Sequence, residues 1–126
     1  MGFHVSQEDV DRAHDELWQI SAALLAIPKS EQDDYDRGRF AGLGRGECAF
    51  WGIYRRARAR SQGGMWVRFA KEDIEMAIQE VAPSPVALPE CGRTHERGVK
   101  DGRTQATIVL QRILDRARMR WVRDHR

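Results

Sequence analysis

Arginine side chains gather at two points of this 126-residue chain, and they are the residues best suited to bind a charged partner. One group lies around position 58, and the other, near the C-terminus, contains Arg116, Arg118, Arg120 and Arg123. Guanidinium groups bind carboxylates and phosphates through paired hydrogen bonds, and Trp121 adds a ring on which a nucleic-acid base could stack. These five residues form the predicted partner-binding site, for either an acidic protein surface or a nucleic acid.

Internal pairing competes with partner binding for the same arginines. In an antiparallel hairpin the start of one helix lies beside the end of the next. The acids at 8–11 would then pair with the arginines at 56–60, and the acids at 72–75 with those at 116–120. The last 36 residues carry ten positive and four negative side chains, which exceeds what the neighbouring acids can pair. This surplus favours partner binding by the second group and internal pairing by the first.

Candidate catalytic and metal-binding residues are few. Cys91 and His95 have the spacing of two zinc ligands on one helical turn, but no second pair completes a four-ligand site. Asp33, Asp34 and Asp36 bring carboxylates together near a helix start, where acids are favoured on electrostatic grounds alone. We therefore expect no catalytic residue, no metal and no cofactor, and an all-helical enzyme with a carboxylate site is the third alternative.

The sequence contains an internal duplication, which dominates the predicted architecture. Residues 36–60 match 96–120 with an offset of 60, and eight of these 25 positions are identical. Upstream, the segment from position 8 matches the segment from position 72 with an offset of 64. Repeat one is therefore 1–60 and repeat two is 66–122, joined by a short glycine link at 61–65. Units of this size are marginal alone, so we expect a single domain over 1–126 with one shared core.

Apolar residues recur at helical spacing in four stretches, so the fold class predicted is mainly α. The expected helices span 7–27, 32–60, 71–81 and 93–122. They would form two helical hairpins related by a pseudo-twofold axis. Ser6 is the expected N-cap of the first helix. The short alternating segments before the first and third helices, 3–5 and 66–69, predict a two-stranded ribbon that joins the repeats.

Small residues line one face in the first half of each long helix. The glycines on this face are Gly38 and Gly42 in repeat one, and Gly98 and Gly102 in repeat two. Each glycine inside a helix costs ~1 kcal/mol relative to alanine, so a compensating interaction is needed. Close approach of another helix is the usual one, and we predict that the two glycine stripes pack against each other.

The composition is that of a soluble globular protein, with 41% hydrophobic and 32% charged residues and a net charge of +2. The chain has neither the roughly 18-residue apolar run of a membrane span nor the pattern of a secretory signal, so we expect a cytoplasmic protein without membrane contact. A duplicated unit can form within one chain the interface of a homodimer, which favours a monomer. Trp18, Trp51 and Trp121 are candidate exposed aromatics and argue weakly for association.

Taken together, these features favour a small non-enzymatic interaction protein that acts as an adaptor or inhibitor of a macromolecular partner. Lysine is rare beside arginine, with Lys29, Lys71 and Lys100 the only lysines. This bias suits an accessory protein from a GC-rich genome. Phage-encoded inhibitors and adaptors often have this general character, so an origin in a phage or mobile element is a hypothesis. A nucleic-acid-binding module that uses the arginine-rich helix ends is the alternative function. Salt-dependent retention on random DNA would separate the two.

Overall fold

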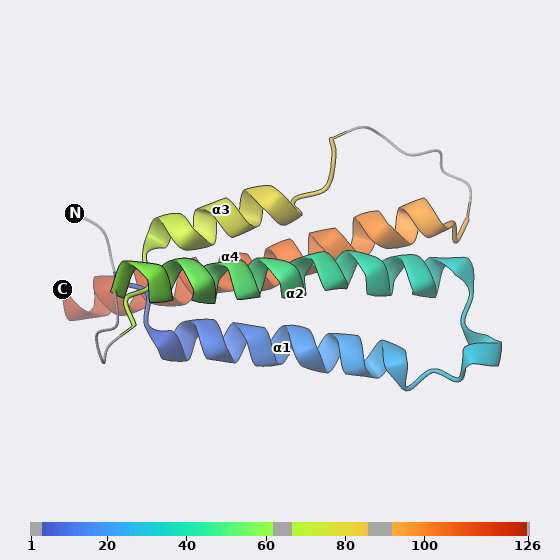
Figure 1. Ribbon diagram of the computed structural model, residues 1–126, viewed down its shortest axis with the longest axis horizontal. Coiled ribbons are helices and arrows are strands. Elements are labelled where there is room, and N and C mark those ends of the chain that lie inside the picture. The colour runs from blue at the N-terminus through green and yellow to red at the C-terminus, as the bar shows by residue number, and fades with distance from the viewer. Residues whose placement is uncertain (1–3, 62–66, 86–91, 126) are drawn as a thin grey trace.

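The computed structural model describes residues 4–61, 67–85 and 92–125, which form four α-helices and one short 3-10 helix (Figure 1). In chain order these are α1 (Gln7–Leu25), η1 (Lys29–Glu31), α2 (Asp34–Ser61), α3 (Lys71–Val81) and α4 (His95–Asp124). The prediction of a mainly helical protein with four helices is confirmed, and the bounds differ from those predicted by at most two residues. Most of the predicted glycine link, 62–65, lies outside the described residues, as does Cys91.

The two long helices, α2 and α4, lie side by side and run in the same direction (Figure 1). The shorter helices α1 and α3 lie on opposite sides of this pair and run antiparallel to it. In the described part of the chain the contact between α2 and α4 is the most extensive, and α1 and α3 each contact both long helices. Each short helix therefore packs in the groove between α2 and α4 and contacts both long helices, including the one that is distant in the sequence.

All four helices contribute to one apolar core. Leu17 of α1, Phe50 of α2, Ile74 of α3 and Ile113 of α4 are fully buried within it. Leu17, Ile74 and Ile113 fall on the apolar stripes that the sequence pattern predicts, whereas Phe50 lies beside the predicted stripe of α2.

The predicted N-cap of α1 is present. The Ser6 hydroxyl oxygen accepts a hydrogen bond from the Asp9 backbone N–H at 3.1 Å, and the Asp9 carboxylate accepts one from the Ser6 N–H at 3.2 Å. This reciprocal pair is a capping box, which satisfies two backbone donors that the first helical turn leaves unpaired. It also fixes the Asp9 side chain at the start of α1.

The four predicted packing glycines lie where α2 and α4 approach most closely. A Cβ atom on Gly38, Gly42, Gly98 or Gly102 would lie only 2.1 to 2.4 Å from a backbone oxygen of the facing helix. Real Cβ atoms do not come this close to backbone, so only glycine fits. At Gly44, on the exposed side of α2, a Cβ atom would have no described atom within 4 Å. The glycine stripes thus allow the parallel contact between the long helices.

The segments before α1 and α3 meet in a single antiparallel bridge between Val5 and Phe69. The described residues of the predicted ribbon, 4–5 and 67–69, form no longer strand pair, so the ribbon prediction is wrong in its extent. The chain enters helices at Gln7 and Lys71, which leaves no room for further ladder pairs on that side. Both bridge residues are buried and extend the core beyond the helix ends.

Candidate interaction surfaces

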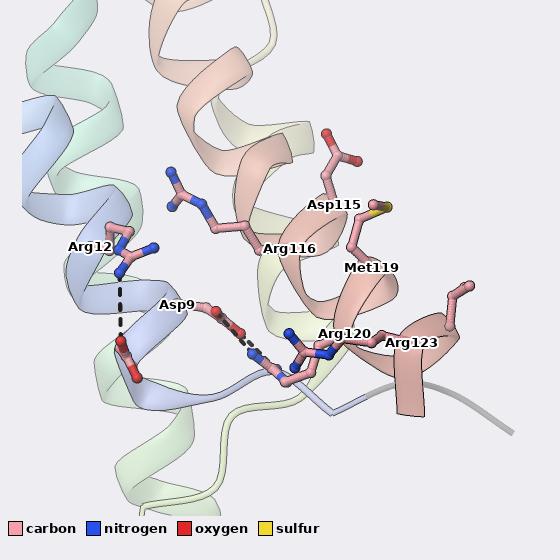
Figure 2. A pocket seen from close by; sticks show the side chains of 9 residues that line it. Asp9, Arg12, Asp115, Arg116, Met119, Arg120 and Arg123 are labelled. Atoms are coloured by element: carbon pink, nitrogen blue, oxygen red, sulfur yellow. Dashed lines mark hydrogen bonds and ion pairs between the residues drawn. The ribbon is translucent and has the colours of Figure 1, made fainter. Parts of the chain in front are cut away.

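An ion pair between Arg120 and Asp9 joins the end of α4 to the start of α1. The Arg120 guanidinium donates to both oxygens of the Asp9 carboxylate at 3.1 and 2.8 Å, and also to the backbone oxygen of His4 at 2.8 Å. Figure 2 shows Arg120 reaching across to Asp9. The Asp9 side chain is 8% exposed. We call this three-way contact the Asp9–Arg120 clasp.

A second clasp joins the end of α2 to the start of α3. Arg60 donates to both oxygens of the Asp73 carboxylate at 2.8 and 2.7 Å, and to the backbone oxygen of Arg68 at 3.1 Å. The Asp73 carboxylate also accepts from the Ala70 N–H at 3.1 Å. The Asp73 side chain is only 3% exposed and that of Arg60 is 41% exposed, so this Asp73–Arg60 clasp joins a buried acid to a partly exposed arginine.

The two clasps correct the predicted pairing of the charged helix ends. The sequence predicts Asp9 beside the arginines of α2 and Asp73 beside those of α4, but each carboxylate pairs with the other long helix. Arg56 of α2 follows the same rule, since it pairs with Asp73 and with Glu80 of α3. The physical reason is the parallel packing of α2 and α4, which places both helix ends beside both short helices.

Electrostatics favour the ionised form of both clasps. Burial alone would raise the pKa of Asp9, but hydrogen bonds from Arg120 and Ser6 outweigh it and hold the pKa below its usual range. The pKa of Asp73 is lowered in the same way, by Arg60 against the cost of burial. Hydrogen bonding to the carboxylates raises the pKa of Arg120 and of Arg60 in turn. Both pairs are therefore charged at neutral pH.

A groove of about 580 Å³ surrounds the Asp9–Arg120 clasp, between the start of α1 and the end of α4 (Figure 2). Three of the predicted partner-binding residues line it: Arg116, Arg120 and Arg123. The remaining two, Arg118 and Trp121, are exposed on the same turns of α4 but do not line the groove. The structure thus places all five on the final turns of one helix.

Some of these arginines are already engaged within the protein. Arg112 and Arg116 both pair with Glu16 of α1, and Arg120 holds its clasp. Within the described part of the chain, the ion pair of Arg123 is with its exposed neighbour Asp124, at 3.6 Å. A pair this exposed contributes little to stability, so the Arg123 guanidinium is available to a partner.

A second hollow, of about 470 Å³, lies over the contact between α1 and α2. Its walls combine carboxylates with aromatic rings, and His14 lies between them. Each helix contributes residues at intervals of four and then three positions, which share one helical face. These residues are Asp11, Asp15 and Trp18 of α1, and Glu47, Trp51 and Tyr54 of α2.

Contacts among these side chains order the base of the hollow. The His14 ring stacks on Phe50 with centroids 4.7 Å apart, and its Nε2 atom lies 2.7 Å from a Glu47 carboxylate oxygen. The Tyr54 hydroxyl donates to Asp11 at 2.6 Å. Burial, followed by this hydrogen bond, raises the pKa of Tyr54, so the phenol keeps its proton. Trp51 packs beside Tyr54, with ring centroids 5.8 Å apart.

Sequence reasoning identified the aromatic part of this hollow but missed the acids. Trp18 and Trp51 were expected to be exposed, and each is 58% exposed. The signal that could have found the rest is the spacing of Asp11, Asp15 and Trp18, which a second helix repeats with an acid followed by two aromatics. Unless it is known which face of α1 packs on which face of α2, that pattern looks the same as an ordinary solvent-exposed helix face.

The carboxylates considered for an enzyme site lie at the start of α2 and organise it. Asp33 and Asp36 each accept a hydrogen bond from the other's backbone N–H, at 2.8 and 3.3 Å. Arg93, just before α4, pairs with both at 2.5 and 3.0 Å, and its guanidinium lies 4.4 Å above the Tyr35 ring. The hydrogen bond from Arg93 and that from the Asp36 backbone lower the pKa of Asp33 to about 2. These acids therefore tie the starts of the two long helices together.

The described residues include neither a metal-binding cluster nor a membrane-spanning helix. No group of three or more His, Cys, Asp or Glu side chains there is placed to hold a metal ion. None of the helices in the same part of the chain has the length and apolar character needed to cross a membrane.

Comparison with known proteins identifies no relative. No protein family, no curated protein and no solved structure matches this chain. The inference of function therefore rests on the two surfaces of the molecule itself.

Proposed function

We propose that this chain is a small non-enzymatic interaction protein, an adaptor or inhibitor, whose α4 end contacts an acidic surface of a partner protein. The observation that carries the proposal is the groove between α1 and α4. Four arginines line it, together with the apolar side chains of Met119 and Val122. Apolar contacts inside a polar rim are the usual composition of a protein interface, in which methionine and arginine are enriched.

The apolar and acidic side chains of this groove favour a protein partner over a nucleic acid. Met119 is 69% exposed and Val122 is 43% exposed, which leaves uncovered apolar surface at the helix end. Glu8 and Asp115 also line the groove, so its lining is mixed in charge and not purely cationic. Nucleic-acid interfaces are much more uniformly positive. Nucleic-acid binding remains the alternative that the experiment below tests.

The predicted contact residues divide into two roles in this proposal. Arg120 and Arg116 hold α1 against α4 through Asp9 and Glu16 and shape the groove. Arg118, Trp121 and Arg123 are exposed and present the contact groups. Trp121 is 39% exposed and stacks on His125, so its indole is held at the surface by a neighbouring ring.

We also propose that the molecule is an internally duplicated pair of helical hairpins, related by a pseudo-twofold axis and monomeric. Reciprocal contacts support the duplication. Asp9 corresponds to Asp73 and Arg60 to Arg120 in the sequence match, and each acid pairs with the arginine of the other repeat. Val5 corresponds to Phe69, and these two form the bridge.

The glycine contact adds a further reciprocal pair in support of the duplication. Gly38 lies against the backbone of His95, and Gly98 lies against the backbone of Tyr35. Tyr35 and His95 occupy corresponding positions in the two repeats. The same exchange between repeats thus recurs at both ends of the long-helix pair.

The test is capture of partners from a lysate of the source cells by the tagged chain and by two charge-matched variants. One variant carries Arg118→Glu and Arg123→Glu; the control carries Arg55→Glu and Arg58→Glu, at exposed positions near the end of α2. The proposal predicts a protein captured by the wild type and by the control, lost from the α4 variant, and retained after nuclease treatment. Equal capture by both variants would remove α4 from the interface, and loss on nuclease treatment would favour nucleic acid.

A further inference from the structure

The hollow between α1 and α2 differs from the rest of the surface in its chemistry. Three carboxylates, from Asp11, Asp15 and Glu47, line it without arginine or lysine, whereas Arg55 and Arg58 line a neighbouring hollow that shares Trp51. The chain as a whole carries a net charge of +2, so this is a local reversal of sign. A concentration of negative charge beside uncovered rings is suited to a cation that also has a flat face.

The two tryptophans of the hollow are not needed to complete the core, whereas Tyr54 packs against it. Trp18 and Trp51 are each 58% exposed, although tryptophan has more apolar area to bury than any other residue. The corresponding positions of the second repeat hold Gln111, on α4, and Ala82, which follows the last residue of α3. The scaffold therefore accepts a polar residue at the position of Trp51, and the exposure of both tryptophans leaves them no evident packing role.

The acids of the hollow, like its tryptophans, are found mainly in the first repeat. Glu47 corresponds to Thr107 and Asp15 to Gln79, so the second repeat lacks two of the three carboxylates. Their present contacts are with uncharged or titratable groups: Glu47 with His14, and Asp15 with the Gln19 amide at 2.9 Å. The hollow is thus both negative and aromatic in only one half of the molecule.

We propose that this hollow binds an arginine side chain presented by a basic segment of a partner protein, at a site separate from the α4 end. A guanidinium group stacks flat on an indole ring and donates paired hydrogen bonds to a carboxylate, which is the combination that Trp51 and the neighbouring acids offer. A nucleic acid would also stack on the rings, but the three carboxylates repel its phosphates. The site goes beyond the proposed function, because it adds a cation-binding surface to an anion-binding one.

The experiment titrates the isotopically labelled full chain with a hexa-arginine peptide and follows the tryptophan indole N–H signals by NMR. A hexa-citrulline peptide, which has the same shape without the charge, is the control ligand. The proposal predicts saturable shifts of the Trp18 and Trp51 signals with hexa-arginine, no such shifts with hexa-citrulline, and an unmoved Trp121 signal. Binding of both peptides alike, or shifts confined to other tryptophans, would overturn it.

Variants taken from the second repeat locate the site. Trp51→Gln and Glu47→Thr introduce the residues found at 111 and 107, and each should weaken hexa-arginine binding by about fivefold, the loss expected for one cation–π or charged contact. Asp15→Asn, a conservative change at an exposed position, should weaken it similarly and guards against misfolding of the other two. Trp121→Ala should bind like the wild type.

Sedimentation of the wild type and the Trp51→Gln variant distinguishes a foreign partner from a second copy of this chain. The proposal predicts that both sediment as monomers at the concentrations used for NMR. A wild-type dimer that Trp51→Gln dissociates would overturn the proposal, because the hollow would then be an interface between copies. Unchanged hexa-arginine affinity in all three variants would overturn it as well.

Discussion

The two proposed repeats resemble each other in the interior of this molecule and differ on its surface. Inside, contacts come in reciprocal pairs: the Asp9–Arg120 clasp has its counterpart in the Asp73–Arg60 clasp, and the two glycine stripes face each other. On the surface, the aromatic and acidic hollow over α1 and α2 has no counterpart at the corresponding positions over α3 and α4. The difference separates residues required by the scaffold from residues that are free to serve binding.

The same comparison changes the role expected of the arginine-rich helix ends. Arginine is conspicuous at both ends, but Arg60 and Arg120 hold buried aspartates and belong to the scaffold. Arg118 and Arg123, two and three residues from Arg120 on the same helix, carry the same charge at exposed positions. Charge alone therefore does not identify a binding residue, and burial of its acidic neighbour is the more informative property.

The largest effect is expected from breaking a clasp. Asp73→Asn should lower the free energy of unfolding by about 3 kcal/mol, near the lower end for a broken buried ion pair because Arg60 is partly exposed. Asp9→Asn should cost a similar amount. Chemical denaturation followed by circular dichroism measures both.

Double-mutant cycles on the clasps then test which charges are coupled. Asp9 should couple to Arg120 and not to Arg60, and Asp73 should couple to Arg60 and not to Arg120. Coupling of Asp9 to Arg60 instead would mean that the acids pair within each hairpin. That result would refute the pairing of each acid with the arginine of the other proposed repeat.

The next effect comes from the glycine contact. Gly42→Ala places a Cβ atom 2.4 Å from the backbone oxygen of Val99, so we expect destabilisation by about 1–3 kcal/mol through overpacking. Gly44→Ala, two residues away on the open side of the same helix, should instead stabilise by up to about 1 kcal/mol. Thermal melts of the two variants should shift in opposite directions. Similar upward shifts would show that α2 and α4 are not in close contact.

A smaller effect is expected from low pH, which should reduce the free energy of unfolding by protonating the clasp carboxylates. The pKa values of Asp9 and Asp73 are lower in the folded than in the unfolded protein, so the clasps stabilise fully above the unfolded aspartate pKa of about 4. That stabilisation is lost as the pH falls below this value and the carboxyl groups protonate. Denaturation midpoints should be steady from neutral pH to about pH 5 and fall below it. The Asp9→Asn, Asp73→Asn double variant should show a flatter acid limb.

The helices were predictable because each carries its own signals. Apolar spacing defined α1 and α3, the Ser6 cap marked where α1 begins, and the glycines indicated a close helix contact. Tertiary pairing was not predictable in the same way. An acid lies beside an arginine whether it pairs within its own hairpin or with the other one. Sequence spacing does not reveal that α2 and α4 run parallel, which places their ends beside both short helices.

The candidate sites were predictable only in part, for a related reason. The exposure of Trp18 and Trp51 followed from their places outside the apolar stripes. Their meeting with Asp11, Asp15 and Glu47 depends on which face of α1 packs on which face of α2, and that register is a tertiary property. The duplication offered one usable clue, because positions where the repeats differ in chemistry are candidates for function.

The smallest effect on stability, and the most direct test of the division between scaffold and surface, comes from Trp18→Ala combined with Trp51→Gln. These are the residues that the second repeat carries at positions 82 and 111. The measurement is the free energy of unfolding of this variant beside its affinity for hexa-arginine. We predict a loss of stability below about 1 kcal/mol, as for surface substitutions, together with loss of peptide binding. Collapse of stability with peptide binding intact would contradict the account, because the tryptophans would then belong to the scaffold.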